Sequence, residues 1–454
     1  MSVTSSSSSV SPLAPREGER LVTGWGRTAP SSARIAAVAS VDDIVREVRG
    51  AGPRGVLARG LGRSYGDAAQ SGGATLLDLS ALDAATLDPT TGTVTAGAGA
   101  SLDALLRTLV PSGWFVPVTP GTRMVTVGGA IAADIHGKNH HVEGTFGAHV
   151  QAMSVVDGRG DVRTLTPQDP GFWAVVGGMG LAGVVTEATF DLIPITSAQM
   201  SVDTDRLADL DAVMAAMVDG DDAYRYSVAW IDSLSPSGRG VLTRGDHATG
   251  TSSPADLAYD PKPRLRAPAI VPGGLLSPLS VRAFNEAWYR KAPKHRVGEH
   301  QSIPAFFHPL DGVLDWNRVY GPGGFLQYQF VVPDSAGDLV RVALDRLRAI
   351  GAPSFLTVLK RFGAANAGPL SFPSPGWTLA LDVPARVDGL SAVLDDLDAQ
   401  VLAAGGRLYL AKDSRMSPAM MAASYPRLEE WRAQRALLDP DRVFTSDLAR
   451  RVGL

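Results

Sequence analysis

The sequence predicts an α+β protein with two lobes, and three features indicate that fold class. Short strands and helices alternate up to about residue 196, and three glycine-rich loops lie between them. After residue 197 the glycine clusters end and longer amphipathic segments follow. The strands and helices of this second part are expected to form an antiparallel sheet backed by helices.

Local patterns define the elements of the first lobe. Ser40 and Asp43 form a capping box that starts a helix ending near Gly50. Leucines at helical spacing predict a second helix over residues 101–109. Short apolar runs predict strands at residues 55–58, 74–79, 93–97, 114–117 and 184–190.

The second lobe is expected to begin with a helix over residues 204–218, because apolar side chains recur there at helical spacing. Strands are predicted at residues 226–230, 324–332, 354–360, 377–383 and 407–411, with helices at 337–350 and 389–402. Residues 416–454 return to helical patterning. Residues 267–281 carry no charge and three prolines, which fits either a covered surface loop or a mobile lid that touches a lipid chain or membrane.

The composition limits the possible functions. At 454 residues with 45% hydrophobic content, the chain can fill the cores of two lobes. A net charge of −4 without a polybasic run argues against nucleic acid as the main partner, because that affinity comes largely from Lys and Arg on phosphates. The absence of Cys excludes disulfides, thiolate nucleophiles and cysteinyl links to a metal or flavin.

The N-terminus is predicted to be a disordered tail over residues 1–19, because it is rich in Ser and Pro and lacks the apolar core of a signal peptide. No segment of the sequence reaches the roughly 18 uncharged apolar residues that a membrane span needs. Any contact with a membrane is therefore expected to be peripheral.

The most informative stretch is the glycine-rich loop at residues 58–67. It follows a predicted buried strand and contains Gly60, Gly62 and Gly66. Because glycine has no Cβ, backbone N–H groups there can come close to the phosphates of a ligand. No helix opens after the loop, as a Rossmann fingerprint or a P-loop would require. The loop therefore predicts a diphosphate cradle outside both of those folds.

Two more loops extend this pattern. Residues 120–141 are rich in small side chains and end in a polar cluster, and residues 177–183 contain four glycines before a predicted strand. Three such loops before residue 190 indicate one large, extended ligand that carries phosphate.

These motifs resemble a known superfamily. Gly-Leu-Gly-Arg-Ser-Tyr-Gly-Asp, Pro-Gly-Thr-Arg and Thr-Val-Gly-Gly are similar to the FAD-binding domain of the vanillyl-alcohol oxidase (p-cresol methylhydroxylase) superfamily. Within it, the motifs at residues 134–141, 324–330 and 411–415 resemble the flavin subunits of the epimerase that acts on decaprenylphosphoryl-β-D-ribose. The resemblance covers residues 23–454. It implies an FAD-binding domain at 20–196, a substrate-binding domain at 197–412, and a segment at 413–454 that completes the FAD domain.

The resemblance also implies how FAD binds. Related sugar oxidases often attach flavin through a His at the position of Arg63, or through a Cys, and neither is present here. FAD is therefore expected to be non-covalent. The implied FAD-binding residues are Ala58, Arg59, Gly60, Leu61, Gly62, Arg63, Ser64, Tyr65, Gly66, Asp67, Ala68, Gly121, Thr126, Val127, Gly128, Gly129, His136, Gly137, Lys138, Asn139, Val185 and Tyr409.

Oxidation of an alcohol needs a group that takes the hydroxyl proton, and Lys412 is the first candidate. It lies just past a predicted strand in an apolar run, where loss of water lowers the pKa of an ammonium group. The alternative is an exposed lysine paired with Asp413. His136 is the second candidate, and it could instead be structural. A metal site at His136, His140 and His141 is disfavoured because Lys138 lies among them and carboxylates are sparse.

The expected substrate site combines charge, amides and aromatic rings. Lys360 beside Phe362 suits a phosphate joined to an apolar chain. Gln327 and Gln329 share one side of a strand, where they could bind sugar hydroxyls or form a solvent-facing edge. The resemblance adds Tyr65 and Trp230 as walls. It also places Ala380 where many members have Cys, and Thr378 where Asn is common, so inhibitors that need that thiol should fail.

The resulting hypothesis is FAD-dependent oxidation of the 2′-hydroxyl of decaprenylphosphoryl-β-D-ribose to the 2′-keto sugar. A separate NADH-dependent reductase would then complete the epimerisation that supplies arabinose for cell-wall arabinan. The enzyme would work peripherally on the periplasmic or cytoplasmic face of the inner membrane. The alternatives are an oxygen-dependent sugar, alditol or aldonolactone oxidase, and a flavin-binding protein without turnover.

Overall fold

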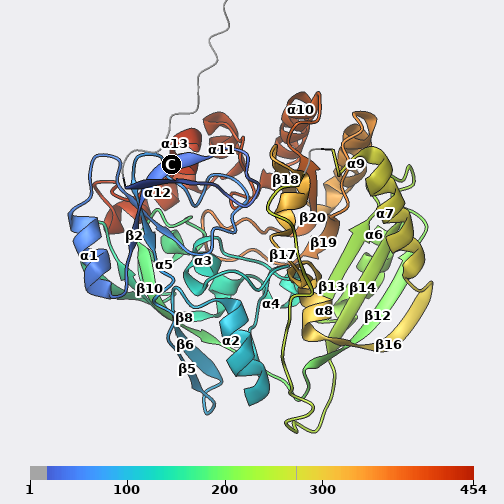
Figure 1. The fold of residues 1–454 in the computed structure, drawn as a ribbon, viewed down its shortest axis with the longest axis horizontal. Coiled ribbons are helices and arrows are strands. Elements are labelled where there is room, and N and C mark those ends of the chain that lie inside the picture. Colours follow the sequence, from blue (N-terminus) through green and yellow to red (C-terminus); the bar gives the residue numbers. More distant parts are fainter. Residues whose placement is uncertain (1–17, 272–273) are drawn as a thin grey trace, which may run out of the picture.

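A computed structural model describes residues 18–271 and 274–454. Most of the predicted tail, residues 1–17, lies outside the described residues. Gly18 and Glu19 are described, and Glu19 begins the first strand, so the tail prediction extended too far. One large buried apolar cluster runs through both lobes, and two smaller ones lie beside it in the described part of the chain. The predicted α+β class, with two lobes and an antiparallel sheet backed by helices, is confirmed (Figure 1).

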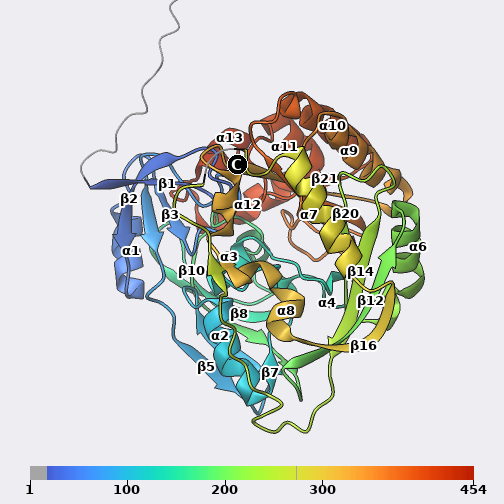
Figure 2. The same ribbon diagram turned by 45° about the vertical axis from the view of Figure 1, so that its right-hand side comes forward.

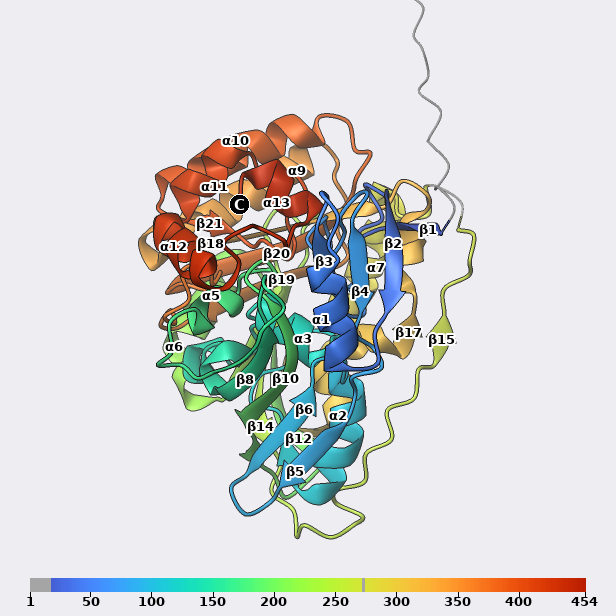
Figure 3. The same ribbon diagram turned by 90° about the vertical axis from the view of Figure 1, so that its left-hand side faces the viewer.

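The first lobe contains a small two-stranded sheet of β7 (Trp114–Phe115) and β11 (Ile193–Pro194), and two larger sheets (Figure 3). In one, β2, β4 and β3 are parallel and β1 pairs antiparallel with β2. The other is antiparallel, in the order β5-β6-β10-β8-β9. The strands are β1 (Glu19–Val22), β2 (Ser31–Ala37), β3 (Val56–Arg59), β4 (Thr75–Asp78), β5 (Ala85–Asp88), β6 (Thr93–Gly97), β8 (Val150–Val156), β9 (Val162–Leu165) and β10 (Val184–Asp191).

Short helices connect these strands, and their caps follow from the sequence. Ser40 and Asp43 form the expected capping box at the start of α1 (Val41–Arg49). Thr126 caps α3 (Val127–Ala132) by accepting a hydrogen bond from the Gly129 N–H. The remaining helices of this part are α2 (Leu102–Leu109), α4 (His140–Glu143) and α5 (Phe172–Val175).

The second lobe is built on one antiparallel sheet in the order β16-β12-β14-β13-β19-β20-β18-β21. Helices α6 (Leu210–Gly220), α9 (Asp338–Ala349) and α10 (Leu390–Ala403) cover its outer face (Figure 1). Its inner face is turned toward the first lobe. The strands are β12 (Gln199–Leu207), β13 (Tyr226–Ile231), β14 (Gly240–His247), β16 (His295–Ser302), β18 (Phe325–Val332), β19 (Thr357–Phe362), β20 (Gly376–Pro384) and β21 (Arg407–Leu408).

Two predicted elements of this lobe need correction. The helix predicted from residue 204 begins only at Leu210, because residues 204–207 belong to β12, which pairs with β14 on one side and β16 on the other. Asp209 then caps the helix by accepting from the Ala212 N–H at 2.8 Å. The strand predicted at residues 407–411 is only two residues long, because the chain turns after Leu408.

The uncharged stretch at residues 267–281 is part loop and part helix. Helix α7 (Pro278–Lys291) begins inside it and is capped by Ser277. Pro272 and Gly273 lie outside the described residues. Ala267 and Val271 are buried, whereas Ile270 is 87% exposed. The segment therefore contains both buried and exposed residues. Figure 2 shows α7 in front of the large sheet.

The C-terminal segment returns to the first lobe. Helices α11 (Pro418–Ser424), α12 (Leu428–Leu438) and α13 (Asp447–Val452) follow β21. The Trp431 indole donates to the Ala174 carbonyl at 3.0 Å. The Arg451 guanidinium contacts Asp67 at 2.7 Å and Asp413 at 2.8 Å. We infer from these contacts the division into residues 20–196, 197–412 and 413–454 expected from the sequence.

Candidate active site

A cavity of about 770 Å³ lies between the lobes. The glycine loops of the first lobe form one wall, and the inner face of the eight-stranded sheet forms the other, from β16 across to β18. Successive side chains of a strand point to opposite faces, so alternate residues of each strand reach the cavity. Its volume is in the range of binding sites for drug-sized ligands and cofactors.

The loop at residues 60–64 presents unpaired backbone donors to this cavity. Within the described part of the chain, the backbone N–H groups of these five residues form no hydrogen bond. Gly62 has a φ of 63°, a conformation that favours glycine. A Cβ on Gly60 would collide with the side chain of Thr126. A run of free N–H groups in a glycine turn suits an anion such as a diphosphate.

Most of the predicted FAD-binding residues line the same cavity. They come from the first loop, from the block around α3 and from later strands. The residues that do so are Ala58, Gly60, Leu61, Gly62, Arg63, Ser64, Tyr65, Ala68, Gly121, Thr126, Gly128, Gly129, His136, Gly137, Lys138, Val185 and Tyr409.

Five predicted FAD-binding residues do not line the cavity. The Arg59 guanidinium donates to the carbonyls of Thr23 and Ala69. The Asn139 amide donates to Pro117 O at 2.7 Å. The other three support the loops: Val127 is buried in the core, Asp67 pairs with Arg451, and Gly66 leaves room for the backbone of Asp413. These five residues therefore support the loops from the side that faces away from the cavity.

The predicted substrate residues also meet at this cavity, apart from Phe362. Trp230, Gln327, Gln329, Lys360, Ala380 and Lys412 line it. Phe362 packs behind His136, with ring centroids 4.7 Å apart. Ala380 on β20 lies opposite Gln329 on β18 and Val358 on β19 in the sheet register, at the middle of the sheet wall.

His136 is held by two side chains of the sheet. The Lys360 ammonium lies 3.0 Å from its Nδ1, and the Gln329 amide lies 3.2 Å from its Nε2. The Gln329 group at this contact is its amide nitrogen, so both neighbours present N–H groups to the ring, and a neutral imidazole accepts at one of its two nitrogens. Burial lowers the pKa of His136 well below its usual value, and the charge of Lys360 lowers it further. His136 is therefore neutral at pH 7.

Lys412 lies over an aromatic ring and interacts electrostatically with a buried carboxyl group. Its Nζ is 3.7 Å from the centre of the Tyr65 ring. Burial lowers the pKa of Lys412, and Asp382 opposes that change. Burial in turn raises the pKa of Asp382. The alternative pairing with Asp413 is not present, because Asp413 contacts Arg451.

Asp382 belongs to this site but was not predicted from the sequence. It is fully buried on β20, and its Oδ1 accepts from the Gln327 amide at 2.5 Å. Its Oδ2 has no hydrogen-bond partner in the described part of the chain. Asp382 is two residues from Ala380, so it shares the cavity face of the strand. A charged residue in an otherwise apolar strand was the available signal.

The cavity is electropositive. Lys138, Lys360 and Lys412 line it, and among the described residues none of the three lies within 4.0 Å of a carboxylate. Burial lowers the pKa of both Lys138 and Lys360 to about 7. Three desolvated amines of this kind suit an anionic ligand, because a bound anion would favour their charged form.

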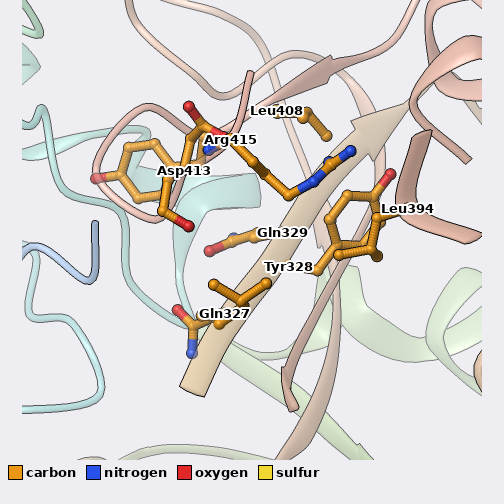
Figure 4. Close-up of a pocket in the computed structure, with 10 residues that line it drawn as sticks. Gln327, Tyr328, Gln329, Leu394, Leu408, Asp413 and Arg415 are labelled. Carbon is orange, nitrogen blue, oxygen red and sulfur yellow. The ribbon is translucent and has the colours of Figure 1, made fainter. Parts of the chain in front are cut away.

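A second, small pocket lies behind β18 (Figure 4). Its volume of about 10 Å³ is enough for a single water molecule. Tyr328 lies beside Leu394 there and donates to Asp398 at 2.9 Å, and Arg415 contacts the same carboxylate at 2.6 Å. This polar group supports the strand that carries Gln327 and Gln329.

Comparison with known proteins identifies the family. Residues 32–166 match the family model described as an FAD binding domain. The chain is 46% identical to decaprenylphosphoryl-β-D-ribose oxidase of Mycolicibacterium smegmatis, over 97% of this chain and 98% of that protein. The chain belongs to the decaprenylphosphoryl-β-D-ribose oxidase family. It is an FAD-dependent oxidoreductase, and the vanillyl-alcohol oxidase type of fold expected from its motifs is confirmed.

The chain is also similar to more distant proteins. An alditol oxidase from a Streptomyces species is 27% identical over 94% of this chain and 98% of its own length. A solved structure of the BBE-like 1 protein of Physcomitrella patens superposes with a TM-score of 0.65 at 16% identity, covering 94% of this chain and 96% of that one. The latter likeness concerns the fold alone.

Proposed function

We propose that the protein oxidises the 2′-hydroxyl of decaprenylphosphoryl-β-D-ribose to the 2′-keto sugar. The observation that carries this proposal is the 46% identity, over nearly the whole chain, to an enzyme named for that substrate. The cavity agrees with it, because a phosphate-binding loop and three buried lysines face each other there. Alditol oxidase is only 27% identical, which favours the ribose lipid over a free alditol.

FAD would bind non-covalently along the wall of the first lobe. The free N–H groups of residues 60–64 suit its diphosphate. Arg63, at the position where related oxidases carry an attaching His, lies over the Trp25 ring at 3.9 Å and offers no nucleophile for a covalent link. When bound, FAD supplies the acceptor for the hydride that leaves C2′ of the sugar.

Lys412 is the group we assign to the hydroxyl proton. Its burial favours the neutral amine, which can accept a proton, and Asp382 then favours the ammonium that results. His136 is less suited, because both of its ring nitrogens are already in contact with Gln329 and Lys360. We assign His136 to orienting Lys360 and contacting the flavin, which leaves Lys412 as the base.

The remaining residues of the sheet wall would bind the sugar and its phosphate. Gln327 donates its amide to Asp382, so its carbonyl oxygen is left for a ribose hydroxyl. Lys360 offers positive charge for the phosphate, and Tyr65 and Trp230 form apolar walls. Ala380 offers no thiol at the middle of the site.

The reaction also has consequences for partners. The 2′-keto product retains its lipid, so a separate NADH-dependent reductase would have to reduce it with inverted configuration. Among the described residues, no helix is long and apolar enough to cross a membrane. We therefore propose peripheral contact with the inner membrane, on its periplasmic or cytoplasmic face, as the way the enzyme reaches a lipid-linked substrate.

The decisive experiment mixes the purified flavoprotein anaerobically with candidate substrates and follows the flavin absorbance. The proposal expects bleaching by decaprenylphosphoryl-β-D-ribose and none by free ribose, alditols or aldonolactones. Bleaching by free alditols or lactones would instead favour the alditol oxidase alternative. Acid precipitation of the same sample should release all yellow colour into the supernatant, as non-covalent FAD requires.

A further inference from the structure

Helix α7 has an unusual distribution of side chains. Residues 279, 283, 284, 287 and 288 are all apolar and exposed, at spacings that place them on one broad side of the helix. Leu279 is 77% exposed, Phe284 46% and Trp288 41%. Leu275 and Ile270 before the helix, and Val297 after it, are also exposed. Exposed apolar side chains that gather on one surface in this way mark an interaction site.

Polar contacts hold the opposite side of α7 against the protein. The Asn285 amide is fully buried and donates to Asp232 at 2.8 Å. Glu286 accepts from Arg239 at 2.5 Å, and the Tyr289 hydroxyl donates to the Leu207 carbonyl at 3.2 Å. A surface helix normally turns its apolar side inward. Here polar groups fix the inner side, so the apolar side is presented outward in a set orientation.

Basic residues flank this apolar surface. Residues 278–297 contain five Lys or Arg and one Glu, in a chain whose net charge is −4. Arg290 and Arg296 pair with Glu286 and Glu299. In the described part of the chain, Arg282, Lys291 and Lys294 form no ion pair, so their charges are available to an external partner. Apolar side chains bordered by free cations are typical of segments that bind anionic lipid surfaces.

The surface is continuous with the substrate cavity. Trp288, Lys291 and Arg296 line the cavity at its outer end. Phe284 stacks on Trp288 with ring centroids 6.1 Å apart and contacts Phe355 at 5.7 Å. The Phe355 carbonyl accepts from the indole of Trp230, which lines the cavity inside. An unbroken aromatic path therefore leads from the cavity to α7.

We propose that the outer side of α7, with the basic segment at residues 290–296, docks on a membrane surface that carries anionic lipid, and that the substrate cavity opens toward that surface. This inference rests on the proposed function, because a lipid-linked substrate must pass from a bilayer into the cavity. The lipid chain would follow Trp288 and Phe284, and Lys291 and Arg296 would meet its phosphate at the entrance.

The test is flotation of the FAD-loaded protein with phosphatidylcholine vesicles, with and without phosphatidylglycerol. Wild type should float with the anionic vesicles and much less with neutral ones, and added salt should release it. Arg282→Gln with Lys294→Gln should weaken binding about fivefold for each cation removed. Leu275→Ser with Leu279→Ser should weaken it further. None of these four side chains lines the cavity.

A matched control is Arg20→Gln with Leu21→Ser on β1, where both side chains are exposed on another face. It should float as wild type does. Melting curves establish that all variants are folded. Equal flotation of the α7 variants and wild type would overturn the proposal, and so would vesicle-independent capture of a protein partner that these variants abolish.

Turnover separates this proposal from the proposed function. With a short-chain, water-soluble analogue of the ribose lipid, the α7 variants should react at the wild-type rate. With substrate embedded in vesicles, their KM should rise while kcat stays unchanged. If no ribose lipid reduces the flavin but the α7 variants still lose vesicle binding, the proposed function fails and the docking surface stands.

Discussion

Replacing Asp382 by Asn should move the pH dependence of catalysis toward acid. The Asp382 carboxylate favours the protonated form of Lys412 and so raises its pKa against the effect of burial. Without that charge, burial dominates and the Lys412 pKa falls. A nearby opposite charge typically changes a pKa by about 1–3 units. The acid limb of kcat/KM should therefore shift by about one to three pH units to lower pH.

The substitution is mild in structural terms. Asp382 Oδ1 accepts from the Gln327 amide, and an Asn carbonyl can accept the same hydrogen bond. The plateau rate should fall as well, because a less basic amine accepts a proton less readily. The assay is anaerobic stopped-flow reduction of the flavin between pH 5 and 9.

The control is Asp398→Asn, which removes a carboxylate that faces Tyr328 and Arg415 behind β18. It should leave the acid limb where it is, and Asp382→Glu should restore the wild-type profile. An acid limb at the wild-type pH in Asp382→Asn would refute the reasoning, since Lys412 would then titrate without the carboxylate.

Three further outcomes are expected. Lys412→Met should slow flavin reduction by about 10²–10⁴-fold, the range of general-base catalysis, while FAD absorbance of the purified protein is retained; loss of colour would mean a structural role. Gly60→Ala should weaken FAD binding at least tenfold in fluorescence titrations because its Cβ meets Thr126, whereas Gly52→Ala, with open space around it, should bind as wild type. Thiol-directed inhibitors should leave the wild-type mass unchanged and add stoichiometrically to Ala380→Cys, and an adduct on wild type would contradict the site.

Local chemistry explains what the sequence could predict. The glycine loop at residues 60–66, the capped helix α1 and the sheet strands each depend on neighbouring residues, so their patterns are visible without tertiary structure. The resemblance of the motifs to a known family then predicted that loops far apart in the sequence bind one ligand. The cavity contains most of the residues expected from that combination.

Pairing and burial explain what the sequence did not reveal. Residues 204–207 fit a helical pattern, but they belong to β12 because that strand pairs with β14 on one side and β16 on the other. β16 has a polar sequence with its first four residues exposed, so it lacks the alternation of a strand with one buried face. The role of Asp382 depends on the folded chain, where Gln327 of β18 donates to it and Lys412, in the turn after β21, interacts with it electrostatically.

Arg451 sets a condition on the order in which the parts of the site come together. Its guanidinium joins Asp67, beside the glycine loop and 384 residues before Arg451 in the sequence, to Asp413, beside Lys412. This link cannot form until Arg451 has been synthesised and the segment that carries it has folded back onto the first lobe. We therefore expect the glycine loop and the lysine assigned to the hydroxyl proton to take up their final positions together, only after residues 413–454 have folded back.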